Sequence, residues 1–276
     1  MMTINTIKKF NNGVEIPMLG FGVFQAVSGD ETINSVKWAL EAGYRHLDTA
    51  TIYENEASVG IGMEESGVAR EDIFLTTKLW NEDMRQGREM EAFEKSLKDL
   101  RTNYVDLYLV HWPVDCFEKS WKLVEEIYRS GRAKAIGVSN FQIHHLEQLE
   151  KVWNIVPAVN QVESHPLLNQ NELKTYCESK GIALEAYSPL GSSRGNLLQN
   201  ETVCVIAEKY KKTPAQIVIR WDLQRGVIVI PKSVHKERII SNKEVFDFEL
   251  SGDDMSLIDL LNKNHRFMDD PDNFDF

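Results

Sequence analysis

The sequence has few cysteines, few prolines and a deficit of positive charge, and it contains no long apolar run. Its three cysteines, Cys116, Cys177 and Cys204, are widely spaced and form no Cys-x-x-Cys pair, which is typical of a reduced protein without disulfides or bound zinc. The 42 acidic and 31 basic residues give a net charge of −11, which argues against nucleic acid or an anionic membrane as a partner. No stretch approaches the ~18 apolar residues of a membrane span, and the amino terminus lacks a signal-peptide core. We therefore expect a soluble, cytoplasmic protein that acts as a monomer.

Predicted strands and helices alternate along the whole chain. No proline- or serine-rich linker and no change of composition divides it, so we expect a single domain over residues 1–276. Residues 4–10 and 14–16 flank Asn-Asn-Gly, a strong β-hairpin signal. Amphipathic helical stretches occur at 89–101, 118–129, 142–152 and 200–210. Eight β-like runs precede or separate such stretches: 20–24, 44–48, 73–78, 104–110, 133–139, 158–163, 182–187 and 227–230.

Eight strands alternating with helices are typical of a (β/α)8 barrel, which usually needs ~250 residues. The alternative is a doubly wound sheet with a glycine-rich phosphate loop. Its fingerprint fails twice, because Gly20-x-Gly22 is followed by Gln25 and Gly60-x-Gly62 by Glu65 where the third glycine belongs. The sequence therefore predicts a (β/α)8 TIM barrel with an N-terminal β-hairpin.

Polar side chains stand where the predicted strands end. In a barrel the carboxyl ends of the strands meet at one mouth, where the active site lies. Each such residue alone could be a turn cap or a solvated charge, but a ring of them predicts a polar site. The residues at these ends are Asp48, Lys78, His111, Ser139, Asn140, Gln161, Tyr187 and Lys232.

Four residues in this group suit acid–base chemistry. Tyr53 lies five residues beyond Asp48, at the expected start of the following helix. A phenol with a pKa near ~10 is a weak acid at neutral pH. The ammonium of Lys78 at ~4–6 Å would lower that pKa by roughly 1–3, and Asp48 would hold Lys78 charged. His111 could orient a substrate oxygen beside the phenol. The four residues together predict a proton donor for an oxygen that becomes an alkoxide.

Seven segments occur in the order in which the aldo-keto reductases carry similar ones: GYRHLDTATIYENEASVG, TTKLW, LYLVHWP, IGVSNF, VNQVESHP, AYSPL and IPKS. The resemblance spans Gly20 to about Asn242. Within the family the chain is most similar to a small bacterial branch of glyoxal or methylglyoxal reductases and 2,5-diketo-gluconate reductases, which also includes prostaglandin F synthase-like members.

The resemblance implies roles for individual residues. Tyr53 would be the general acid, Asp48 and Lys78 its tuning pair, and His111 the group that orients the carbonyl. The implied cofactor is NADPH, extended across the barrel mouth, and the implied partner is a small carbonyl substrate. The residues expected to bind the cofactor are Ser139, Asn140, Gln161, Tyr187, Ser188, Leu190, Lys232, Ser233, Val234, Arg238 and Asn242. Phe24, Trp80 and Trp112 would line the substrate pocket.

The segment IPKSVHKER predicts where a phosphate would lie. A helix that begins near Ser233 would offer backbone N–H groups to an anion. Lys232 and Arg238 add two cations suited to the 2′-phosphate that distinguishes NADPH from NADH. The alternative is an ordinary exposed basic patch. The resemblance implies NADPH-dependent reduction of aldehydes and reactive carbonyl compounds to alcohols, the substrates being 2-oxoaldehydes such as glyoxal and methylglyoxal or small keto compounds. The alternative is a non-catalytic NADPH-binding regulatory protein on the same scaffold.

Several features depart from the family pattern or lie outside it. Phe24 stands where the family usually has tryptophan, His235 where it has threonine or a similar small residue, and the segments after His111 and Tyr187 are short. His-His-Leu-Glu at 144–147 lacks metalloprotease spacing, so we expect a solvated helix face and no metal. A last helix over 253–261, capped by Ser251, should lead into a tail, 264–276. We expect Phe267 or its neighbours to close the pocket beside Trp80, with the acidic end of the tail outside.

Overall fold

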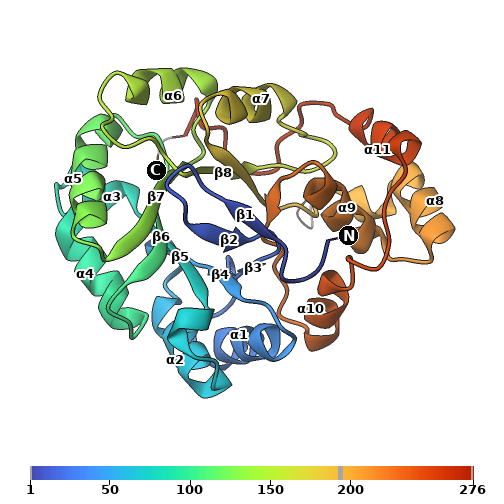
Figure 1. The fold of residues 1–276 in the computed structure, drawn as a ribbon, viewed down its shortest axis with the longest axis horizontal. Coiled ribbons are helices and arrows are strands. Elements are labelled where there is room, and N and C mark those ends of the chain that lie inside the picture. The colour runs from blue at the N-terminus through green and yellow to red at the C-terminus, as the bar shows by residue number, and fades with distance from the viewer. Residues whose placement is uncertain (1, 192–194, 275) are drawn as a thin grey trace.

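The computed structural model, which describes residues 2–191, 195–274 and 276, is a barrel of eight parallel strands ringed by helices (Figure 1). The strands follow one another in chain order around the barrel. The first and last are joined by backbone hydrogen bonds, such as that from Gly20 N–H to the Val229 carbonyl oxygen at 2.8 Å, which close the ring. The strands are β3 (Phe21–Gly22), β4 (His46–Asp48), β5 (Phe74–Leu79), β6 (Val105–Val110), β7 (Ala133–Ser139), β8 (Val159–Glu163), β9 (Ala183–Tyr187) and β10 (Ile228–Val229).

The helices pack apolar faces against the barrel. In α5 (Phe117–Arg129), Phe117, Trp121 and Val124 are buried at helical spacing, and they join the core that surrounds the strands. The remaining helices are α1 (Asp30–Glu41), α2 (Glu56–Ser66), α3 (Asn81–Arg85), α4 (Glu89–Asp99), α6 (Ile143–Glu150), α7 (Asn171–Ser179), α8 (Glu201–Tyr210), α9 (Pro214–Gln224), α10 (Lys236–Lys243) and α11 (Gly252–Asp259). None of the helices in the described part of the chain has the length and apolar character needed to cross a membrane.

The N-terminal hairpin closes one end of the barrel. Strands β1 (Ile7–Lys9) and β2 (Glu15–Pro17) pair antiparallel, and Gly13 takes the positive φ of 89° that their turn requires. Phe10 and Ile16 pack into a buried cluster with residues near the amino ends of several strands, including Phe74. In Figure 1 the hairpin lies across the near end of the barrel. The carboxyl ends of the strands therefore form the open mouth.

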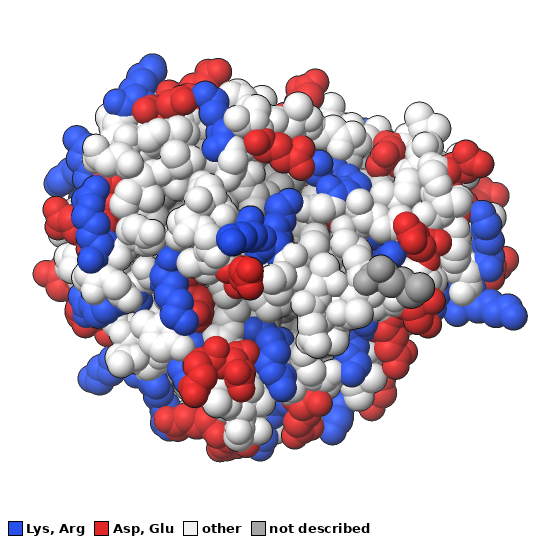
Figure 2. All heavy atoms as spheres, in the orientation of Figure 1, with Lys and Arg blue, Asp and Glu red and all other residues white. Residues whose placement is uncertain are grey.

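The structure confirms the predicted fold, with all eight strands, and corrects two local predictions. The helix expected near Ser233 begins at Lys236, because the Ser233 hydroxyl accepts the His235 N–H and forms a turn first. Tyr53 lies in a short 3-10 helix, Thr51–Tyr53, that precedes α2 rather than starting it. All three cysteines are free thiols. On the face with the hairpin, basic and acidic side chains are interspersed (Figure 2).

Candidate active site

Lys78 joins the acid–base residues at the bottom of the mouth. Its fully buried ammonium lies 2.6 Å from Asp48 Oδ1, and it donates to the Thr49 carbonyl oxygen at 2.8 Å. It also lies 3.4 Å from the Tyr53 hydroxyl oxygen. The other Asp48 oxygen, Oδ2, accepts a hydrogen bond from Gln161 Nε2 at 2.7 Å. Strands β4, β5 and β8 and the turn after β4 thus bring the predicted groups together, with Lys78 between the carboxylate and the phenol.

The pKa of Tyr53 shifts in the direction opposite to the one expected from the sequence. Burial raises the pKa of Tyr53, and the opposing attraction of Lys78 does not overcome it. The expected net lowering is therefore wrong, because a phenolate beside Lys78 is also deprived of water. Burial opposes the charge on Lys78, but Asp48 and Tyr53 outweigh it and raise the Lys78 pKa. The resting site therefore contains a charged lysine beside a protonated phenol.

His111 completes the group as a neutral imidazole. It is buried at the end of β6, and its ring centroid lies 5.8 Å from that of Tyr53 in an edge-to-face arrangement. Burial, followed by the charge of Lys78, places the pKa of His111 well below its usual value. A neutral imidazole can donate one hydrogen bond to a substrate oxygen without carrying a charge.

A cavity of about 1140 Å³ extends from these residues across the mouth. Sixteen of the eighteen residues predicted for the site line this cavity, and the exceptions are Lys78, which lies beneath Tyr53, and Ser139. The Ser139 hydroxyl is buried and accepts a hydrogen bond from Asn140 Nδ2 at 3.2 Å. Of the segment after Tyr187 that was noted as short, residues 192–194 lie outside the described residues.

Asn140 connects three strand ends on one side of the cavity. Its Nδ2 group donates to the His111 carbonyl oxygen at 3.1 Å, and its Oδ1 atom accepts from the Tyr187 hydroxyl at 2.7 Å. Its φ of 67° is a left-handed conformation that asparagine tolerates better than most residues. The second bond holds the Tyr187 hydroxyl at Asn140, so an aromatic ring and the amides of Asn140 and Gln161 line the same cavity as Tyr53.

The opposite end of the cavity is basic. Lys232 and Arg238 both line it, beside the first turn of α10. Arg238 is exposed, and within the described ranges no ion pair to it is found. Lys232 is half-buried, and burial lowers its pKa. Two cations beside a helix N-terminus can bind a phosphate group.

Comparison with known proteins places this arrangement in a family. A family model described as the aldo/keto reductase family matches residues 18–263. The chain belongs to the aldo/keto reductase family. It is 54% identical over 265 residues to the glyoxal reductase of Bacillus subtilis, covering 96% of this chain and 95% of that protein. It is 44% identical over 272 residues to the methylglyoxal reductase DkgA of Escherichia coli, covering 98% of both.

Solved structures agree with this assignment. An aldo-keto reductase from a Medee basin deep-sea metagenome library superposes with a TM-score of 0.94 at 46% identity, covering 98% of this chain and 100% of that one. A Bombyx mori aldo-keto reductase in complex with NADP superposes with a TM-score of 0.91 at 36% identity, covering 99% and 97%. The resemblance found in the sequence is therefore confirmed at the level of the family.

The tail of this aldo/keto reductase crosses the mouth, but not as expected. Phe276 stacks on Trp80 with ring centroids 5.7 Å apart and planes at 9°, and Phe274 contacts Trp112 with centroids 4.9 Å apart. Phe267 instead packs against His165, away from Trp80. The acidic residues are not all outside either, since Asp269 lines the cavity. Of the residues expected to close the pocket, Met268, the neighbour of Phe267, lines the same cavity as Trp80. The expectation for Phe267 itself is wrong, and the ring stacked on Trp80 is that of Phe276.

The helix face at 144–147 is exposed at His144 and Glu147, as expected, but it also contacts the tail. His144 Nε2 lies 3.2 Å from Asp272 Oδ1, and His145 Nε2 lies 3.7 Å from it. These three donors could surround a metal ion. However, His145 Nδ1 accepts the Gln142 N–H at 3.1 Å, which leaves the proton of a neutral ring on Nε2, the atom facing Asp272. The geometry therefore favours attachment of the tail to α6 over metal binding.

Sequence reasoning missed cavity residues that come from helices and loops. They include Ile52, Leu198, Gln199, Thr213, Ala215 and Ser241. Thr213 had a usable signal, because Thr213 and Gln216 form a capping box that marks the start of α9. That signal locates a helix start but not the direction in which it points, so it could not place Thr213 at the mouth.

Proposed function

We propose that this protein is an NADPH-dependent carbonyl reductase that converts aldehydes and small reactive carbonyl compounds, including 2-oxoaldehydes such as glyoxal and methylglyoxal, to alcohols. The observation that carries the proposal is the buried Lys78 ammonium between Asp48 and the Tyr53 hydroxyl, at the floor of a large cavity. The glyoxal and methylglyoxal reductases that share about half of this sequence support the substrate class.

The cavity suits the cofactor at both ends. Lys232 and Arg238 fit the 2′-phosphate, and the first turn of α10 adds backbone N–H groups. Asn140 and Gln161 would hold the carboxamide, while Tyr187 would stack on the nicotinamide ring. Ser139 would orient Asn140, and the cofactor would extend past a final group of residues: Ser188, Leu190, Ser233, Val234 and Asn242. When bound, NADPH supplies the hydride.

The protein supplies orientation and the proton. His111 donates a hydrogen bond to the carbonyl oxygen and so holds it at Tyr53. Tyr53 gives its proton to that oxygen as negative charge develops there. Lys78 stabilises the phenolate that remains, and Asp48 holds Lys78 in place. Phe24, Trp80 and Trp112 form apolar walls that exclude water. We further propose that the chain acts as a single domain over residues 1–276, as a cytoplasmic monomer that does not bind nucleic acid.

The direct test measures NADPH oxidation by absorbance with a panel of aldehydes, 2-oxoaldehydes, keto acids and open-chain sugars. With NADPH, we expect turnover to be faster with 2-oxoaldehydes than with the other compounds of the panel. With NADH in place of NADPH, we expect turnover to be much slower. The alternative, a non-catalytic NADPH-binding regulatory protein, predicts cofactor binding without turnover on any compound of the panel. No observation in this structure favours that alternative.

The pKa directions predict the pH dependence of reduction. His111 remains neutral and Tyr53 remains protonated across the neutral range, so kcat/KM should be flat between about pH 6 and 9. It should fall at higher pH, as Tyr53 loses the proton that it must donate. Oxidation of the product alcohol, which needs the phenolate, should show the opposite trend. An acid limb near pH 6.5 in the reduction profile would mean that His111 titrates in that range.

The tail aromatics should affect substrate choice. Replacing both Phe274 and Phe276 with alanine removes the rings that pack on Trp112 and Trp80. We expect KM for methylglyoxal to rise about 10-fold, consistent with the loss of roughly one apolar contact, while kcat and NADPH affinity change little. Steady-state kinetics check this, with Leu257→Ala on exposed α11 as control. Unchanged KM values across the carbonyl panel would show that the tail does not shape the pocket.

A further inference from the structure

Glu163 is a buried carboxylate that the reaction does not use. It ends β8, two residues after Gln161, and its side chain is fully buried. Its Oε1 atom accepts the Phe267 N–H at 2.7 Å, and its Oε2 atom accepts the Met268 N–H at 3.2 Å. His165 Nε2 lies 3.1 Å from Oε1. Both carboxylate oxygens of Glu163 thus accept hydrogen bonds from the backbone of a segment more than a hundred residues away in sequence.

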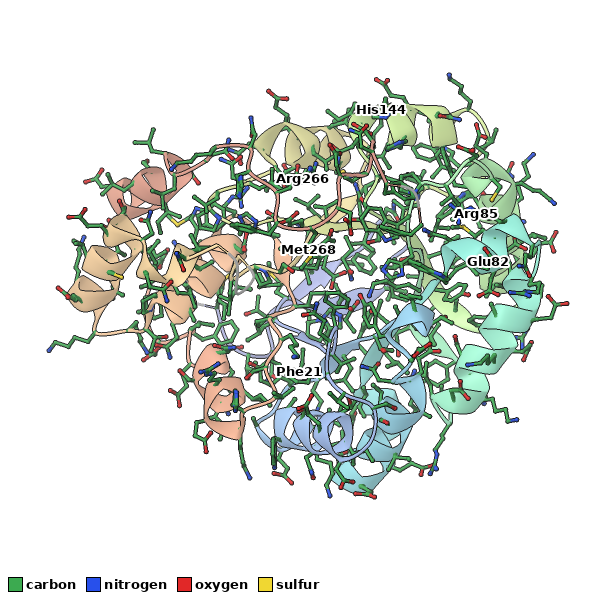
Figure 3. All side chains as sticks on the ribbon, turned by 180° about the vertical axis from the view of Figure 1, so that it is seen from behind. Phe21, Glu82, Arg85, His144, Arg266 and Met268 are labelled. Atoms are coloured by element: carbon green, nitrogen blue, oxygen red, sulfur yellow. The ribbon has the colours of Figure 1, made fainter. Side chains whose placement is uncertain are left out.

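The segment that Glu163 holds is the start of the tail over the mouth. The Phe267 ring packs on His165. It also lies so close to Gly195 that a Cβ atom added to Gly195 would be 2.1 Å from the ring. Met268, the next residue, lines the cavity, and the chain then continues to the rings on Trp112 and Trp80. Figure 3 shows Met268 near the middle of the view, with Arg266 above it. The carboxylate therefore fixes the point at which the tail enters the mouth.

The polar contacts of the tail with His144 and Arg85 lie at the surface. His144 and Asp272 are 59% and 46% exposed, so their pairing is weakened by water and salt. Asn81 Nδ2 and Arg85 donate to the Phe276 carbonyl oxygen at 3.3 and 3.0 Å, and the Arg85 contact is exposed. Figure 3 places His144 and Arg85 toward the rim. A buried carboxylate that accepts two backbone N–H groups is the stronger anchor, because water cannot replace its partners without opening the structure.

We propose that Glu163 is a positioning residue that determines substrate size, by holding residues 267–274 and Phe276 across the barrel mouth. With the tail in place, the space beside Trp80 and Trp112 is filled by Phe276 and Phe274, which leaves room for small carbonyl compounds. The proposal rests on the proposed carbonyl reductase function. It concerns a side chain that acts through the tail rather than by contact with the reacting atoms.

The test variant is Glu163→Gln. Glutamine keeps the shape and one acceptor, but it turns an NH2 group toward one of the two backbone N–H groups. We expect KM for methylglyoxal to rise about 10-fold with kcat within about 2-fold, as for loss of a charge-assisted hydrogen bond. The ratio of kcat/KM for a bulky aromatic aldehyde to that for methylglyoxal should rise about 10-fold. Glu172→Gln, an exposed residue of α7, is the matched control and should behave as the parent protein.

A double substitution tests whether Glu163 acts through the tail. In the full-length Phe274→Ala/Phe276→Ala protein the rings no longer fill the pocket. Adding Glu163→Gln there should change the substrate ratio by less than about 2-fold, because coupled residues are non-additive. An undiminished 10-fold change in that background would overturn the proposal.

Limited trypsin digestion gives a readout that does not depend on catalysis. Trypsin can cleave after Lys263 and Arg266, and Arg266 directly precedes the anchored Phe267. Glu163→Gln should speed cleavage at these two sites about 10-fold, while Glu172→Gln should not. If Glu163→Gln does not fold, Glu163→Asp keeps the charge but shortens the reach, and it should give a smaller effect of the same sign. Equal cleavage rates in all variants overturn the anchor, whereas a parent protein that reduces no carbonyl compound overturns only the proposed function.

Discussion

Replacing Tyr53 with phenylalanine is expected to lower kcat for carbonyl reduction by about 10³-fold or more, the size of a general-acid contribution. The change removes the hydroxyl beside Lys78 that gives its proton to the substrate oxygen in our proposal. NADPH affinity should remain near that of the parent protein. The expected effect is therefore almost entirely on the chemical step.

The packing around Tyr53 makes this substitution selective. Its ring lies 5.0 Å from Phe24 and 5.8 Å from His111, centroid to centroid, and phenylalanine retains both contacts. Lys78 keeps Asp48 and the Thr49 carbonyl oxygen as partners, so no charge is left unpaired. Tyr104→Phe removes a half-exposed hydroxyl distant from the site and serves as the control. Single-turnover kinetics and fluorescence titration with NADPH measure the two effects, and reduction at near the parent rate would contradict the mechanism.

The strands and the residues at their ends could be predicted from the sequence for a physical reason. Parallel barrel strands are buried on both faces, so each reads as an apolar run, and a polar residue at its end stands out. Asp48, Lys78 and His111 were found in this way. Their distances follow from the barrel, since β4, β5 and β6 are neighbours in register.

The tail and the protonation of Tyr53 could not be predicted in the same way. Residues 264–276 have no helical or strand period, and their path is set by contacts such as Glu163 with Phe267, which are distant in sequence. The choice of Phe267 over Phe276 was therefore arbitrary at the level of sequence. The net pKa shift of Tyr53 depends on how completely burial removes water, which residue type and spacing do not encode.

The basic end of the cavity gives the second large expected effect. Replacing both Lys232 and Arg238 with alanine should weaken NADPH binding by about 10²-fold or more, because each charge-assisted contact to a phosphate contributes ~1.5–3 kcal/mol and exposure of Arg238 reduces that somewhat. NADH lacks the 2′-phosphate, so its affinity should change by less than about 3-fold on the same reasoning. The preference for NADPH should therefore disappear or reverse.

The control for this prediction removes the same number of charges, both from α10. Lys236 pairs with Glu41, the last residue of α1, and Lys243 donates a hydrogen bond to the carbonyl oxygen of Ala42, which follows it. The variant Lys236→Ala/Lys243→Ala therefore removes two cations that contact the end of α1. Titration of protein fluorescence with both cofactors, at low and high salt, separates a local contact from a general field. A direct contact of Lys232 and Arg238 predicts that only their removal abolishes both the NADPH preference and its salt dependence. Equal losses for NADPH and NADH, or an equal effect of the control, would place the phosphate elsewhere in the cavity.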